Sequence, residues 1–276
     1  MKTIKLLMIF AITAGVFVSC QKEEEIAAPE RNNEVSQEVL SKLESLYFNT
    51  DGVTEELVAN IDGTSSLKYV IEGDIVMSHE QLMSMKIDEG NEQGRQYRTY
   101  NLVSSPSTIR VIGYTGGGGY GLSSKMRTAL QWAVNNYNRL NIGLNFTLDY
   151  GTNYQTYDMV IYRVPNGEVG GKAGFPSNGD PNFGVQIFSG MDGYDLNTIE
   201  HVITHEIGHS VGLRHTDWFS RQSCGQSGEN ANPEGAVHIP GTPTGFDANS
   251  IMLSCFGSGE DGEFGFYDEV ALEYLY

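Results

Sequence analysis

Apolar residues in the second half of the chain follow helical and extended patterns in turn. They recur every three or four positions over residues 123–140, which predicts an amphipathic helix capped by Ser123 or Ser124. Asp195 is placed to cap a second helix over about residues 196–211. Short apolar runs predict strands at residues 109–114, 146–148, 159–162 and 185–188.

The first part of the chain carries weaker patterns. The expected elements are a helix over residues 36–48, a short helix or turn over 53–61, a strand over 67–76 and a polar helix over 78–85. Residues 88–99 are rich in Gly, Gln, Asn and Arg, which predicts a linker. We therefore expect residues 20–105 to form a tether and a propeptide or accessory region, and residues 106–276 to form the main domain.

The N-terminus has the pattern of a signal peptide. A short basic start precedes an apolar run, Leu6 to Val18, that is too short for a membrane span of about 20 residues. Ser19-Cys20 follows and resembles the lipobox of bacterial lipoproteins, although Phe17 stands where that pattern more often has Leu. We expect cleavage after residue 19, lipidation of Cys20 and export to the outer membrane, with cell-surface exposure as an open question. The alternative is a plain secretory signal with an incidental Cys.

Charge limits the classes of binding partner, and cysteine content limits the possible disulfides. The 276-residue chain has a formal net charge of -18, which disfavours nucleic acid and anionic lipid, so we expect membrane contact only through the N-terminal anchor. Beyond Cys20, only Cys224 and Cys255 remain. In an oxidising compartment this pair favours one disulfide over two buried thiols.

One segment near residue 210 carries the candidate chemistry. His205 and His209 lie four residues apart, so a helix projects both imidazoles from one face, close enough to hold one metal ion. Glu206 can reach a water on that metal without being a ligand. Gly212 can adopt a left-handed conformation that ends the helix and turns the chain back, which brings His215 to the third ligand position. Three neutral imidazoles suit one Zn²⁺ and leave a fourth position for water.

With a Gly and a third His at fixed offsets from H-E-x-x-H, this segment resembles the metzincin metallopeptidases. Within them, it is similar to the bacterial family named for the HEIGH motif, over roughly residues 106–276. The resemblance implies an α+β fold: a metzincin-like catalytic domain with a twisted mixed sheet, an active-site helix and a Met-turn, preceded by a small N-terminal region. It implies that Met252 forms the Met-turn beneath the metal. Some metzincins have a Tyr two residues later that assists catalysis, and this chain departs from that pattern with Ser254.

The resemblance also implies an edge strand that pairs with an extended substrate backbone. The residues concerned are Lys172, Ala173, Gly174 and Phe175. A plain surface loop is the alternative for this segment.

Several further side chains could support the site. We interpret Asp217 as a group that orients His215 or its loop, with metal ligation as the alternative. His201, one helical turn before His205, is expected to pack or to support the ligands, and His238 has no assigned role. We expect three further acids to be solvated, with a calcium site as the alternative: Asp180, Asp192 and Asp195.

Together these residues predict a zinc-dependent endopeptidase acting on protein or peptide substrates. A zinc-bound water, activated by Glu206, would attack a peptide carbonyl, and Glu206 would then pass the proton to the leaving amine. One alternative is a surface binding lipoprotein with a vestigial or structural zinc site, which a fourth protein ligand would close. Another is a zinc amidase acting on non-protein amides.

Latency is a separate question. Residues 21–105 contain no Cys, so a propeptide cysteine is not available to bind the metal. If this region is an inhibitory propeptide rather than a spacer, an acidic residue such as Asp74 or Asp88 is the reasonable substitute, because carboxylate oxygen also binds zinc.

Overall fold

The computed structural model describes residues 35–85, 98–226, 239–243 and 245–276. These residues belong to one compact unit, residues 33–276. The expected signal peptide, Cys20, Asp88 and His238 lie outside the described residues. Within the described part of the chain, none of the helices combines the length and apolar character that crossing a membrane requires.

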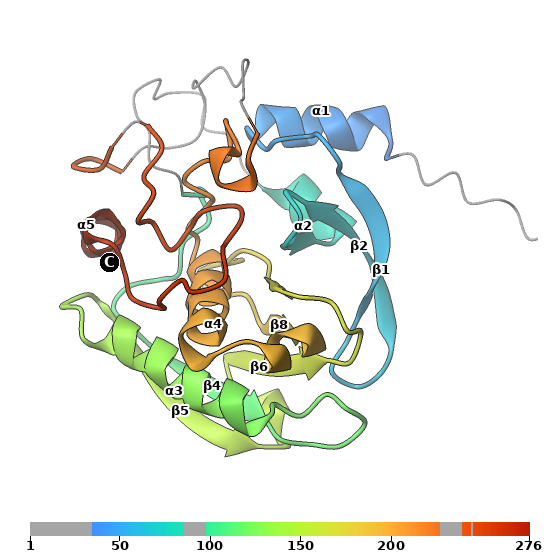
Figure 1. Ribbon diagram of the computed structural model, residues 1–276. Helices are drawn as coiled ribbons and strands as arrows, with labels where there is room; N and C mark the ends of the chain where they lie inside the picture. The colour runs from blue at the N-terminus through green and yellow to red at the C-terminus, as the bar shows by residue number, and fades with distance from the viewer. Residues whose placement is uncertain (1–34, 86–97, 227–238, 244) are drawn as a thin grey trace, which may run out of the picture. The chain divides into compact units, whose positions relative to one another are not determined.

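A five-stranded mixed sheet forms the base of the larger part of the unit (Figure 1). Its strand order is β5-β4-β6-β8-β7, and the first four of these pair in parallel while β7 is an antiparallel edge strand. The strands are β4 (Ser107–Tyr114), β5 (Leu144–Gly151), β6 (Met159–Val164), β7 (Gly171–Lys172) and β8 (Gly184–Phe188). The short apolar runs are therefore confirmed as strands, and the α+β class is correct.

Two long helices, α3 (Ser124–Asn138) and α4 (Leu196–Ser210), pack against each other and against this sheet. Their caps are the predicted ones, because Ser123 accepts a hydrogen bond from the Met126 amide and Asp195 accepts one from the Thr198 amide. Tyr137 of α3 is fully buried and donates to the Thr204 carbonyl of α4 at 2.8 Å. This bond fixes the two helices relative to each other inside the apolar core.

The N-terminal region has its own sheet and its own apolar cluster. It comprises α1 (Gln37–Ser45), β1 (Thr54–Ala59), β2 (Ser65–Ile71), β3 (Ile75–Met77) and α2 (His79–Ser84), with antiparallel order β1-β2-β3. The expectation of a helix or turn over residues 53–61 is wrong in its helical form, because six residues of β1 pair with β2. Cross-strand pairing outweighs the local helix preference of Glu55 and Glu56. The expected strand over 67–76 is interrupted by a turn, at which Glu72 and Gly73 both have positive φ.

The two sheets meet at their edges. Ala173, which follows β7, donates from its amide to the Asp74 carbonyl at 3.0 Å, and its own carbonyl accepts from the Val76 amide at 2.8 Å. Ile75 and Ala173 therefore form a parallel bridge between β3 and the end of β7. The N-terminal region thus covers the outer edge of the larger sheet.

Few regular elements follow α4 in the described residues. The short 3-10 turns η1 (Tyr154–Thr156), η2 (Ser189–Gly193) and η3 (Gln222–Cys224) connect the larger elements. The chain ends in α5 (Phe266–Leu275), a helix that we did not predict.

Candidate metal centre and active site

The helix α4 and the turn after it bring three imidazoles together. His205 and His209 project from one face of α4, and Gly212, with φ of 110°, turns the chain back after the helix ends. His215 returns to the same point, with its Nε2 atom 3.3 Å from that of His205 and 3.2 Å from that of His209. The sequence prediction placed all three at one centre, and the structure has them there.

The other nitrogen of each imidazole is held by an oxygen atom. The Nδ1 contacts are all 2.8 Å long: His205 to the carbonyl of Ile251, His209 to the carbonyl of Leu213, and His215 to the carboxylate of Glu72. Because Nδ1 donates to these acceptors, the lone pair of each Nε2 faces the common centre. The three rings are therefore oriented to bind a metal ion through Nε2. Burial lowers the pKa of His215, but Asp74 and Glu72 outweigh this effect and raise it to about 10, so a metal ion would displace a proton from this ring.

A carboxylate completes the group. Asp74 Oδ2 lies 3.1 Å from Nε2 of His215 and 3.4 Å from Nε2 of His205, and Oδ1 lies 3.8 Å from Nε2 of His209. One ligand atom from each of the four side chains lies within 4.8 Å of the others. A tetrahedral metal with ligand bonds of about 2.0–2.1 Å holds its donors about 3.3–3.4 Å apart. The donor set therefore fits a four-coordinate metal ion.

Glu206 lies beside this group and is buried. Its Oε2 atom has no hydrogen-bond partner among the described residues. Its Oε1 atom faces the edge strand so closely that a Cβ on Gly171 would lie 2.8 Å from it. Burial raises the pKa of Glu206 well above its usual value, and the charge of Asp74 adds to this effect, while His215 and Lys172 oppose it. An unpaired buried carboxyl next to the donor group is expensive to maintain, which points to a chemical role.

The predicted Met-turn packs beneath α4. Gly208 leaves room for Met252, because a Cβ at Gly208 would lie 2.5 Å from Sδ of Met252. Asp268 of α5 holds this turn by accepting bonds from the Ile251 amide at 2.8 Å and the Ser250 hydroxyl at 2.7 Å. Since the Ile251 carbonyl orients His205, the C-terminal helix supports the first ligand through this turn.

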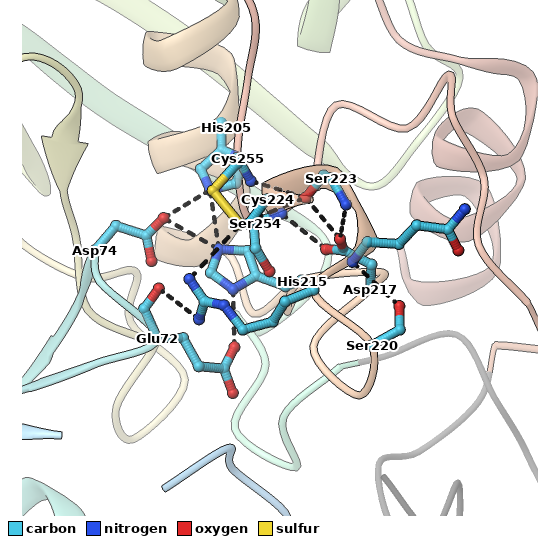
Figure 2. Close-up of a disulfide and its surroundings, with 12 residues drawn as sticks. Glu72, Asp74, His205, His215, Asp217, Ser220, Ser223, Cys224, Ser254 and Cys255 are labelled. Carbon is cyan, nitrogen blue, oxygen red and sulfur yellow. Dashed lines mark hydrogen bonds and ion pairs between the residues drawn. A yellow bond between two sulfur atoms is a disulfide. The ribbon is translucent and has the colours of Figure 1, made fainter. Parts of the chain in front are cut away.

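The loop after His215 is tied to the Met-turn region by a disulfide between Cys224 and Cys255 (Figure 2). Asp217 accepts bonds from the Ser223 amide and hydroxyl, at 2.9 and 2.6 Å, and from the Ser254 amide at 2.9 Å. It therefore holds the loop of the third histidine. The imidazole itself is oriented by Glu72, a residue that sequence reasoning missed.

The remaining candidates have other partners. His201 is buried, its Nδ1 contacts the Asp261 carbonyl at 3.0 Å, and burial lowers its pKa to about 4. Asp192 accepts from Arg163 at 3.0 Å, and Asp195 caps α4. Within the described ranges, the Asp74 group is the only cluster of side chains suited to holding a metal, and neither His201 nor Asp217 belongs to it.

The candidate edge strand is covered. Lys172 forms an ion pair with Glu56 at 3.0 Å, and Ala173 bridges to β3. A Cβ on Gly174 would lie 2.8 Å from the Val76 carbonyl, and Phe175 is buried in the N-terminal apolar cluster. A cavity of about 220 Å³ remains at the centre, lined in part by Asp74, Gly171, His201, His205, Glu206 and Phe256.

Comparison with known proteins gives one family and a distant structural likeness. The profile described as dual-action HEIGH metallo-peptidase matches residues 69–276. No curated protein sequence matches the chain. Two solved structures of myroilysin are similar at 12% identity and a TM-score of 0.39; they cover 61% and 71% of this chain, and the matches span 79% and 95% of theirs.

Proposed function

The chain belongs to the dual-action HEIGH metallo-peptidase family, and we propose that it is a zinc endopeptidase of the metzincin type with Glu206 as its general base. The observation that carries this proposal is the unpaired, buried Glu206 carboxyl beside three imidazoles whose Nε2 atoms converge. His205, His209 and His215 would hold the metal. Three nitrogen donors and an oxygen at these spacings suit Zn²⁺, which prefers tetrahedral N and O ligands.

When bound, Zn²⁺ supplies a Lewis acid that lowers the pKa of water to about 7 and stabilises negative charge on a carbonyl oxygen. Glu206 takes a proton from the attacking water and delivers it to the leaving amine nitrogen. Burial and the charge of Asp74 raise the pKa of Glu206, which makes its ionised carboxylate a stronger base. Gly171 permits this role, since any side chain there would displace the Glu206 carboxyl.

A structural zinc site is the competing function, because Asp74 is a fourth protein donor and a closed site is not catalytic. The family match to peptidases does not favour it. A structural site also gives no reason to bury Glu206 without a partner. A zinc amidase acting on non-protein amides is the other alternative. It would leave a proteome-derived peptide library uncleaved, whereas the proposed endopeptidase would cleave it.

The test compares Glu206→Gln with His209→Ala, each also made together with Asp74→Asn so that the fourth donor does not mask activity. Glu206→Gln should keep zinc and lose nearly all casein hydrolysis, whereas His209→Ala should lose the zinc itself. Glu200→Gln is the matched control on the same helix, because Glu200 bonds to Asn136 away from the donor group. Hydrolysis by the Glu206→Gln, Asp74→Asn double variant equal to that of Asp74→Asn alone would refute the proposed mechanism.

A further inference from the structure

We propose that residues 35–85 are an inhibitor built into the chain, in which Asp74 occupies the fourth metal position and the strand that follows it occupies the substrate edge. This inference rests on the proposed function, since it describes how that same site is kept inactive.

The first step concerns the fourth metal position. A catalytic zinc needs one position open to water or substrate, and the Oδ2 atom of Asp74 lies 3.1–3.4 Å from two of the three ligand nitrogens. That spacing is the one expected between neighbouring ligand atoms of one tetrahedral ion. A carboxylate is also a good zinc ligand, so Asp74 competes directly with water.

The second step concerns the substrate edge. The backbone groups of Ala173, next to the edge strand β7, are bonded to the Asp74 carbonyl and the Val76 amide. An extended peptide that added to this edge would need the same groups. The bound segment presents a side-chain carboxylate to the metal position rather than a peptide carbonyl, so it offers no bond there for hydrolysis.

The third step concerns how the segment is held. Glu72 and Asp74 contact the two ring nitrogens of His215. Glu72 lies 2.8 Å from Nδ1, and Asp74 lies 3.1 Å from Nε2. Glu72 has φ of 55°, an uncommon conformation for a residue other than glycine. The surrounding contacts over-determine that conformation, as is typical of functional segments.

Arg214, the neighbour of His215, fixes a second part of the N-terminal region. Its guanidinium donates to the carbonyls of Leu46 and Tyr47 at 3.1 and 2.6 Å, and it lies 4.0 Å from the centre of the Phe48 ring. It also lies 3.4 Å from Glu72. Displacing this region would separate the buried charges of Arg214 and Glu72, which costs free energy. This cost stabilises the inhibited state.

The experiment uses the full chain as wild type, Asp74→Asn and Asp51→Asn. Asp51 is an exposed aspartate of the same region and serves as the matched control. Each protein is loaded with Co²⁺ in place of zinc and titrated with acetohydroxamic acid, a small metal-binding probe, while the visible absorption of the cobalt is recorded. Hydrolysis of one peptide substrate is measured in parallel with the zinc-loaded proteins.

We expect Asp74→Asn to bind the probe at least roughly tenfold more tightly than the wild type does. In the wild type, the Asp74 carboxylate is an intramolecular ligand that competes with the probe at a high effective concentration. Its peptide hydrolysis should rise in parallel, and Asp51→Asn should match the wild type in both. Equal probe affinity in the wild type and Asp74→Asn overturns the inference. Tighter probe binding without any peptide hydrolysis supports Asp74 as the blocking ligand, because the backbone bonds at Ala173 still cover the substrate edge in this variant. Peptide hydrolysis that stays absent after limited proteolysis has removed residues 35–85 would refute the proposed peptidase function.

Loss of cobalt from Asp74→Asn would identify Asp74 as a permanent structural ligand and would also overturn the inference. Asp74→Ala is the second variant, in case the amide disturbs folding. If neither variant folds with metal, the carboxylate is required by the fold, and the inhibitory role is rejected.

Discussion

Reduction of the Cys224–Cys255 disulfide should destabilise the protein mainly through its unfolded state. The bridge spans 31 residues in sequence, and in the chain-entropy description a loop of that length contributes about 3.7 kcal/mol at 25 °C. The folded loop has further ties, because the Cys255 amide donates to the Ser223 hydroxyl at 3.0 Å and that hydroxyl donates to Asp217. The native structure around the bridge should therefore change little when the bond is cut.

Equilibrium unfolding in urea, with and without reductant and at fixed zinc concentration, measures this contribution. With an m-value of about 3 kcal/mol per molar urea, the midpoint should fall by about 1 M. The double variant Cys224→Ser with Cys255→Ser is the control, and its midpoint should not respond to reductant. The reasoning fails if the wild-type midpoint is unchanged although mass analysis after alkylation shows both thiols free.

Two predictions concern the turn beneath the ligands. Gly208→Ala should lower the free energy of unfolding by about 1–3 kcal/mol and reduce turnover, because its Cβ overlaps Met252, whereas Gly193→Ala has no such contact and should be neutral in calorimetry. Asp268→Ala removes the acceptor of two backbone N–H groups, those of Ile251 and Gly265. The free energy of unfolding, measured in urea, should fall by about 2–6 kcal/mol. Asp247→Ala removes the acceptor of a single exposed bond, that from the Asn249 amide, and should cost much less; an equal loss in both would contradict this assignment.

The parts of the fold and site that could be predicted from the sequence are those encoded by local spacing. The four-residue interval between His205 and His209 fixes their shared helix face, and Gly212 sets the turn that returns His215. Asp195 fixes the start of α4 through its cap. Each of these relations extends over a few residues, so the sequence pattern contains all the information needed.

Contacts between residues that lie far apart in the sequence could not be predicted in this way. Glu72 and His215 are 143 residues apart, and no spacing rule connects them. Strand β1 was misread because its partner β2, rather than its own residues, determines its conformation. Helix α5 was missed because Phe266 and Tyr274 are exposed, which blurs the amphipathic pattern by which a helix is recognised.

The position of Arg214 between Phe48 and Trp218 links the fluorescence of Trp218 to the N-terminal region. Its guanidinium lies 5.3 Å from the Trp218 ring, which is buried, while the chain has only one other indole, that of Trp132 on α3. Departure of residues 46–48 would remove the carbonyl acceptors of this guanidinium and change the surroundings of Trp218 but not of Trp132. One of the two tryptophans therefore lies where its emission would follow release of the N-terminal region in real time, without any added label.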